Sequence, residues 1–71
     1  MMVTKERMGK RLKELRTEKG KTISEVSEET GIGESALRNY ECGIRIPNFK
    51  SMFVIAEYYG KTVDAIFFKA G

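Results

Sequence analysis

Residues 22–41 read TISEVSEETGIGESALRNYE, and this stretch decides the fold. Thr22 and Glu25 have the spacing of a capping box, in which the hydroxyl accepts from a first-turn amide and the carboxylate accepts from the cap's own amide. The pattern predicts a helix from about Ile23 to Thr30. Gly31 and Gly33 then interrupt it, and glycine permits the positive φ of a tight turn between two helices.

Helical signals continue on both sides of this turn. Gly20 closes an amphipathic run near the N-terminus, Asn48 can cap a helix after Pro47, and Thr62 can cap a short last one. The predicted helices are about 4–19, 23–30, 34–42, 49–59 and 63–68. We therefore expect an all-α, compact five-helix fold in a single domain over residues 1–71, with a helix-turn-helix at about 22–42.

Composition excludes most catalytic chemistry. The 71 residues suffice for one small domain, which leaves no room for a deep active site. Histidine is absent, Cys42 is the single cysteine, and the carboxylates are scattered along the helices. We expect no enzyme activity, no metal and no cofactor. No apolar run reaches the length of a membrane span or a signal peptide, so a cytoplasmic protein with no membrane association is expected.

The net charge of +3 is unevenly distributed along the chain. Residues 1–21 hold eight Lys and Arg against three Glu, whereas residues 22–71 hold five against seven acids. A basic end suits a phosphate backbone. A solvated amphipathic helix explains the same charges equally well.

The chain resembles the lambda-repressor-like (Cro/CI, or XRE) helix-turn-helix family over roughly residues 6 to 68. The resemblance rests on a glycine and leucine opening, an arginine, two glycine turns, a Glu-x-Gly close and a proline before the fourth helix. The matching residues are Gly9, Leu12, Leu15, Arg16, Gly20, Thr22, Gly31, Ile32, Glu41, Gly43 and Pro47. The resemblance implies a DNA-binding domain whose third helix lies in the major groove.

By this resemblance, the first turns of the third helix read bases. Asn39 can pair with adenine, Ser35 can donate or accept, and the Ala36 methyl can contact thymine. Arg38 can take guanine, contact a phosphate, or remain solvated. Glu34 replaces the family's common glutamine, and it either accepts from cytosine or only stabilises the start of its own helix.

The resemblance also implies phosphate contacts, which fix register and give salt-dependent affinity. Ile23 and Gly33 depart from the family pattern, where a glutamine touches the backbone and a Ser or Thr caps the third helix. Both departures predict weaker binding to the phosphate backbone. The phosphate candidates are Thr22, Ile23 through the amides of its helix, Arg45, Lys50, Lys10 and Lys21.

Three further residues have a structural and a functional interpretation. Arg16 and Glu41 occupy the positions where the family pairs an arginine with a glutamate, so we expect a structural ion pair rather than a catalytic or metal-binding Glu41. Cys42 could act as a redox switch, but without a partner cysteine an inert thiol is expected.

The apolar residues exceed what one core can bury. The predicted core comprises Met8, Leu12, Leu15, Val26, Ile32, Leu37, Tyr40, Phe49, Met52, Ile55, Ala56, Tyr59, Val63 and Ile66. The remaining apolar residues form the predicted dimer interface on helices at about 48–68, namely Phe53, Val54, Tyr58, Phe67 and Phe68. The alternative is that these side chains fold back over the core.

The sequence therefore predicts a dimeric regulator, more specifically a repressor that occupies a roughly palindromic double-stranded DNA operator as a homodimer. A second hypothesis is an antitoxin or anti-repressor that binds a hetero-partner protein through helices at about 48–68. A third is a degenerate domain that no longer binds DNA.

Overall fold

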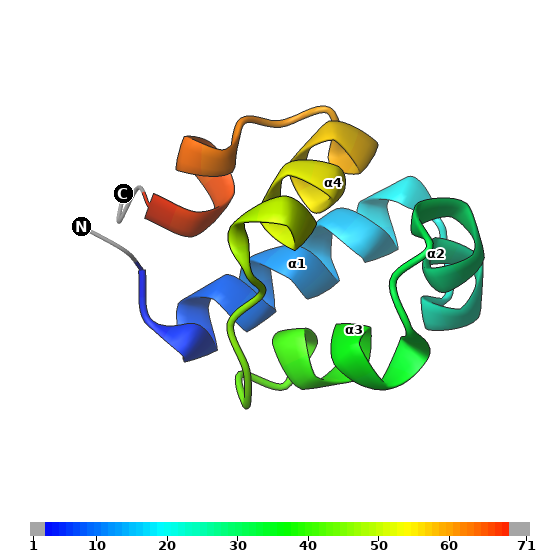
Figure 1. Ribbon diagram of the computed structural model, residues 1–71, viewed down its shortest axis with the longest axis horizontal. Coiled ribbons are helices and arrows are strands. Elements are labelled where there is room, and N and C mark those ends of the chain that lie inside the picture. The colour runs from blue at the N-terminus through cyan, green and yellow to red at the C-terminus, as the bar shows by residue number, and fades with distance from the viewer. Residues whose placement is uncertain (1–2, 69–71) are drawn as a thin grey trace.

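The computed structural model describes residues 3–68. It contains α1 (Lys5–Lys19), α2 (Ile23–Thr30), α3 (Glu34–Glu41), α4 (Phe49–Tyr59) and a short π-helix, η1 (Asp64–Phe68). Figure 1 shows α1 through the middle of the molecule, with α3 on one side of it and α4 and η1 on the other. No strand occurs within the described residues, and the predicted all-α fold is confirmed.

Local capping sets where three of the helices begin. The side chain of Thr4 accepts from the amide of Arg7 at 3.2 Å at the start of α1. Thr22 and Glu25 form both hydrogen bonds of the predicted capping box, at 3.1 and 2.9 Å. Asn48 accepts from the amide of Ser51 at 2.9 Å at the start of α4. Since these contacts are local, the sequence pattern predicts these helices closely.

Both ends of α3 differ from the ends of α1, α2 and α4. Its N-cap, Gly33, supplies no side-chain hydrogen bond, and the helix ends at Glu41, one residue earlier than predicted. Cys42 is the C-cap, and Gly43 follows with a φ of 74°. This positive φ turns the chain away from α3 toward α4.

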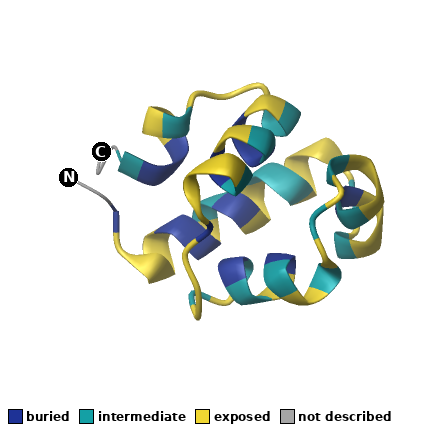
Figure 2. Cartoon of the chain, viewed as in Figure 1, coloured by how far each residue is buried: buried dark blue, intermediate teal, exposed yellow. Residues whose placement is uncertain are grey.

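The core is formed by residues from all four α-helices and from η1 (Figure 2). Gly9 lets α1 and α3 approach closely, because a Cβ atom there would lie 2.5 Å from the carbonyl oxygen of Glu41. The buried apolar residues are Val3, Met8, Leu12, Val26, Leu37, Tyr40, Met52, Ile55, Ala56, Ile66 and Phe67. Four large apolar residues are instead exposed, namely Ile44, Ile46, Phe49 and Phe53.

Two predictions about apolar residues are wrong. Phe67 was expected in a dimer interface, but it is fully buried, and its carbonyl accepts from the amide of Val3 at 3.0 Å. The N-terminal segment and the π-helical turn of η1 place it inside the monomer core. Phe49 was expected in the core, but it is 66% exposed because it lies on the outer side of the first turn of α4.

Candidate nucleic-acid interface

The turn between α2 and α3 is held by its own hydrogen bonds. Gly31 adopts a φ of 78°, and the Thr30 hydroxyl donates to the carbonyl of Val26 at 2.7 Å. The same hydroxyl accepts from the amide of Ile32 at 3.2 Å. The side chain of Ile32 packs against the core. These contacts fix the direction in which α3 leaves the turn.

Packing turns one face of α3 inward and leaves the opposite face free. Leu37 and Tyr40 are buried, whereas Ser35 and Arg38 are exposed. Asn39 is half-buried at the edge of the exposed face. The helix therefore presents hydroxyl, guanidinium and amide groups together, which are the groups that read base edges.

Ala36 is less available than its neighbours. It is half-buried and packs against the core. Its methyl group therefore has only part of its surface free for a thymine methyl group.

Glu34 and Arg38 form an ion pair across one turn of α3. Arg38 Nη2 donates to Glu34 Oε1 at 3.2 Å, and the two side chains are 60% and 42% exposed, respectively. The spacing of four residues places both groups on one helix surface. Neither side chain therefore stands alone at the proposed contact surface.

The loop after α3 is hydrogen-bonded to the end of that helix. The backbone carbonyl of Asn39 accepts from the amides of Ile44 and Arg45, at 2.9 and 3.3 Å. Arg45 is exposed on this loop, and Lys50 is exposed in the first turn of α4. The backbone of Arg45 is thus fixed relative to α3, and Lys50 follows five residues later in α4.

The start of α2 offers backbone rather than side-chain donors. The first amides of a helix have no partner inside it, so an anion can bind there. Thr22 is exposed, while its hydroxyl is engaged in the capping box. Ile23 packs its side chain against the core and can contribute only its amide.

The two remaining candidate lysines lie in different surroundings. Lys21 Nζ binds Glu29 Oε2 at 3.1 Å, and this carboxylate raises the pKa of the lysine. Lys10 is exposed on the outer surface of α1, among Lys13, Glu14 and Thr17. Neither lysine belongs to α3, and Lys21 is engaged by Glu29.

Arg16 and Glu41 join α1 to the end of α3. Arg16 Nε and Nη2 donate to the two carboxylate oxygens of Glu41, at 2.8 and 3.0 Å. Its Nη1 donates to the carbonyl of Lys21 at 2.9 Å. The bond to Glu41 raises the pKa of Arg16, although burial acts against it. The side chains are 18% and 11% exposed, so this largely buried pair holds α3 against α1.

Residues 22–42 carry five glutamates against one arginine, an excess of acid on a segment expected to face DNA. Internal partners occupy most of these carboxylates. Glu41 binds Arg16, Glu34 binds Arg38, and Glu25 accepts from the amide of Thr22. This internal pairing reduces the repulsion that the segment would exert on phosphates.

Glu29 accepts from two side chains. Tyr58 Oη donates to Glu29 Oε1 at 2.5 Å, and Lys21 binds the other oxygen. The hydrogen bond from Tyr58, with that from Lys21, lowers the pKa of Glu29. Lys19 Nζ lies 5.0 Å from the centre of the Tyr58 ring. These contacts tie α2 to α4, and no pattern in the sequence predicts them because the residues are far apart along the chain.

The remaining apolar candidates divide between the core and the surface. Phe53 is 62% exposed and stacks on Phe49 with ring centres 6.3 Å apart. Val54 is half-buried, and Tyr58 and Phe68 pack in part against the core. Ile44, Ile46, Phe49 and Phe53 are hereafter the exposed apolar patch.

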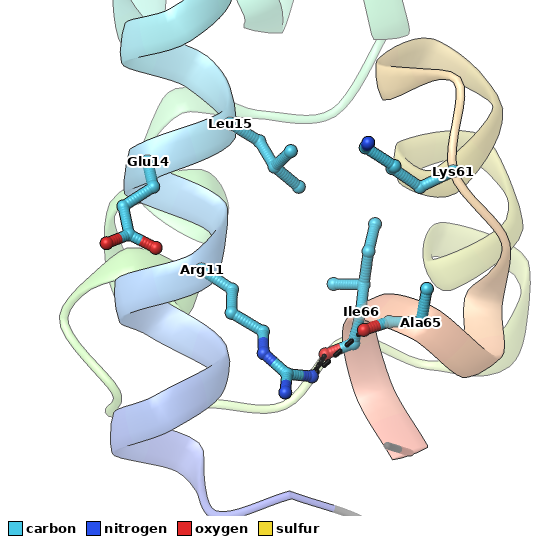
Figure 3. A pocket seen from close by; sticks show the side chains of 6 residues that line it. All are labelled: Arg11, Glu14, Leu15, Lys61, Ala65 and Ile66. Atoms are coloured by element: carbon cyan, nitrogen blue, oxygen red, sulfur yellow. Dashed lines mark hydrogen bonds between the residues drawn. The ribbon is translucent and has the colours of Figure 1, made fainter. Parts of the chain in front are cut away.

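Arg11 lines a pocket of about 250 Å³ between α1 and η1 (Figure 3). Its Nη1 donates to the carbonyls of Ala65 and Ile66, at 2.9 and 3.0 Å. In the figure, Leu15 lies one turn further along α1, Lys61 projects toward the pocket from the opposite side, and Glu14 points away. The guanidinium is thus used to hold η1 in place.

Within residues 3–68, no group of three or more His, Cys, Asp or Glu side chains is placed to hold a metal ion. None of the helices in the same range is long and apolar enough to cross a membrane.

Comparison with known proteins places this geometry in a family. A helix-turn-helix family model matches residues 12–66. The chain belongs to the lambda-repressor-like (Cro/CI-type) helix-turn-helix family. The matched range includes all of α2, α3 and α4.

A curated relative supports the same assignment. The chain is 37% identical over 57 residues to the HTH-type transcriptional regulator ImmR of Bacillus subtilis (strain 168). The match covers 80% of this chain and 45% of that protein, so the chain spans about half the length of its relative.

Proposed function

We propose that this chain binds double-stranded DNA sequence-specifically and regulates transcription, with α3 in the major groove. The exposed face of α3 carries the proposal, because Ser35, Arg38 and Asn39 present base-reading groups there. The printed name of the similar Bacillus subtilis protein, a transcriptional regulator, supports it.

Around this face, the proposed contacts divide by chemistry. Glu34, Ser35, Arg38 and Asn39 read base edges, with a lesser contribution from Ala36. Arg45, Lys50 and the first amides of α2 at Thr22 and Ile23 bind phosphates. Lys21 and Lys10 contribute less, because Lys21 is bound to Glu29 and Lys10 lies on the outer surface of α1.

We further propose that two copies occupy a roughly palindromic operator and act as a repressor. The four side chains of the exposed apolar patch are 42 to 66% exposed, and burying them against a second copy removes them from water. The molecule measures 30 × 23 × 22 Å, so two adjacent copies can place their reading helices about 34 Å apart, one turn of DNA. Phe53 and Val54 are retained as candidates for this interface, whereas Phe67 is excluded because it is buried.

Binding to duplex libraries of random sequence tests the proposal. We expect the chain to select a two-fold site, with affinity that falls steeply as salt increases. Asn39→Ala should remove the preference for one base, while Arg45→Ala should weaken binding to all duplexes alike. If the chain selects no sequence, the proposed function is wrong.

A second candidate function rests on the same exposed apolar patch. The patch could bind a different protein, as in an antitoxin or anti-repressor. The mass of the purified chain in solution separates the two, because a monomer that keeps Phe49 and Phe53 exposed favours a hetero-partner.

A further inference from the structure

Every charged side chain of α3 takes part in an ion pair. The helix contains three charged residues, and Glu41 is held by Arg16 at the inner end. Glu34 and Arg38 hold each other at 3.2 Å on the exposed part of the helix. The charged side chains on the exposed part of α3 are therefore Glu34 and Arg38, which are bound to each other.

Each member of the pair retains hydrogen-bonding groups. An arginine guanidinium has five N–H donors in a fixed plane, and a carboxylate has about four acceptor sites. The bond between Arg38 Nη2 and Glu34 Oε1 uses one of each. The guanidinium can still donate twice to guanine O6 and N7, while Glu34 can still accept from cytosine N4. A single G·C base pair presents both sets of groups in the major groove.

We propose that Glu34 and Arg38 act together as one reader of a G·C base pair, with Glu34 positioning the guanidinium of Arg38. This inference rests on the proposed function, since it concerns how the same surface discriminates between sequences. It assigns Glu34 a role in specificity.

The charge balance favours a base over a phosphate for Arg38. The pair carries no net charge, so it gains little from the negative backbone, and the carboxylate repels a phosphate oxygen beside it. Arg45 and Lys50 are exposed and take part in no ion pair within residues 3–68. Those two residues are better suited to phosphate contacts.

If Glu34 had only a structural role, its removal should have a different effect. Glu34 lies in the first turn of α3, where the helix dipole favours a carboxylate. If that were its whole contribution, removing it would lower helix stability and leave the base preference unchanged. The base preference is therefore the quantity to measure.

Selection from a random duplex library should be carried out with the wild-type chain, Glu34→Ala, Arg38→Ala and the control Glu28→Ala. Glu28 is exposed on α2, so its variant removes one negative charge without breaking the pair. Arg38→Ala should reduce discrimination for one G·C pair about 5- to 150-fold, the range of one bidentate contact. Glu34→Ala should relax the same position, and its salt dependence should steepen by about 0.9 because Arg38 becomes free for a phosphate. Glu28→Ala should keep the wild-type preference.

A second measurement changes the DNA as well as the protein. Replacing the selected guanine by 7-deazaguanine removes N7, and this should weaken binding by the wild-type chain but not by Arg38→Ala. Thermal unfolding of each variant shows that it is folded. If the wild-type chain selects a site and Glu34→Ala keeps every base preference, the inference is wrong and the proposed function stands. If the wild-type chain selects nothing, the proposed function itself fails, and the inference with it.

Discussion

Arg16 holds α3 against its neighbours. Its guanidinium binds Glu41 on α3 and the carbonyl of Lys21 before α2, so one side chain joins three segments. Replacing it by methionine leaves the Glu41 carboxylate, 11% exposed, without its partner. We expect Arg16→Met to lower the free energy of unfolding by about 3 kcal/mol, measured by urea denaturation.

The double variant Arg16→Met, Glu41→Met is the control for this prediction. It removes both charges and should recover a large part of the loss, because the cost arises from one buried charge and not from the absence of the pair. If Arg16→Met is as stable as the wild-type chain, the pair does not hold α3 as described.

Gly9 is required by close packing between α1 and α3. A methyl group at this position would meet the carbonyl oxygens of Glu41 and Tyr40 at 2.5 and 2.8 Å, and backbone atoms cannot move aside like a flexible side chain. Gly9→Ala should therefore destabilise the fold by about 1 to 3 kcal/mol, despite the helix propensity of alanine. Lys10→Ala, an exposed change in the same helix, should have little effect in the same denaturation series.

Tyr59 gives the fold a dependence on alkaline pH. Burial, together with the charge of Glu41, raises the pKa of Tyr59 to about 12, although Arg16 acts against the shift. Between the unfolded value of about 10 and the folded value, the unfolded chain loses the phenolic proton while the folded chain keeps it, so stability falls as pH rises. The free energy of unfolding should decline over this range by up to about 1.4 kcal/mol per pH unit from this group, and Tyr59→Phe should show a shallower decline.

At the scale of the helices, sequence patterns succeed where the cause is local. The capping residues Thr22 and Asn48 act within one turn of themselves, so the starts of α2 and α4 are predictable. Phe67 shows the opposite case. Its burial depends on the π-helical turn of η1 and on Val3 at the other end of the chain. No local pattern contains that information.

The same contrast holds in the candidate site. The resemblance to the family places the candidate base readers on α3, and two of them, Ser35 and Arg38, are exposed. It does not indicate that Lys21 is engaged by Glu29, or that Tyr58 binds the same carboxylate, since these contacts depend on how α2 and α4 pack. Because Lys21 is bound to Glu29, it is a weaker candidate for a phosphate contact than the unpaired Arg45 and Lys50 of the described residues.

A side chain that caps the N-terminus of α3 should increase the stability of the chain. Gly33 has the extended backbone of an N-cap, with φ −61° and ψ 148°, but no side chain to accept from the first turn. A Cβ atom there meets nothing within 4 Å. Gly33→Ser should therefore stabilise the chain by about 0.5 kcal/mol and raise the melting temperature by about 2 to 4 °C. Gly33→Ala, which gains the Cβ without the hydroxyl, is the matched control in thermal unfolding and should be less stable than Gly33→Ser.

At the scale of the whole molecule, the exposed apolar patch is the feature that a monomer does not explain. Phe49 and Phe53 stack on each other at the surface, and Ile44 and Ile46 precede them on the loop from α3. This loop also carries Arg45, a proposed phosphate contact. A second copy covering the patch would therefore couple dimer formation to the placement of both reading helices.

Phe53→Glu tests this coupling. A charge in the proposed interface should raise the dissociation constant of the dimer by at least about 10-fold, since burial of one large apolar side chain contributes about 1.5 to 3 kcal/mol. Sedimentation equilibrium measures this change directly. Binding to a two-fold operator should weaken, and the salt dependence of binding should fall to about half, because a monomer contacts half as many phosphates.

Thr17→Glu adds the same charge to the exposed surface of α1, outside the patch, and should leave the dimer intact. Because Phe53 is 62% exposed in the monomer, the thermal stability of the Phe53→Glu monomer should stay near that of the wild-type chain at concentrations where both are monomeric. A Phe53→Glu chain that still sediments as a dimer would place the interface elsewhere. A wild-type chain that is monomeric at every concentration would instead leave the patch to a different protein, because only the two-copy hypothesis requires self-association.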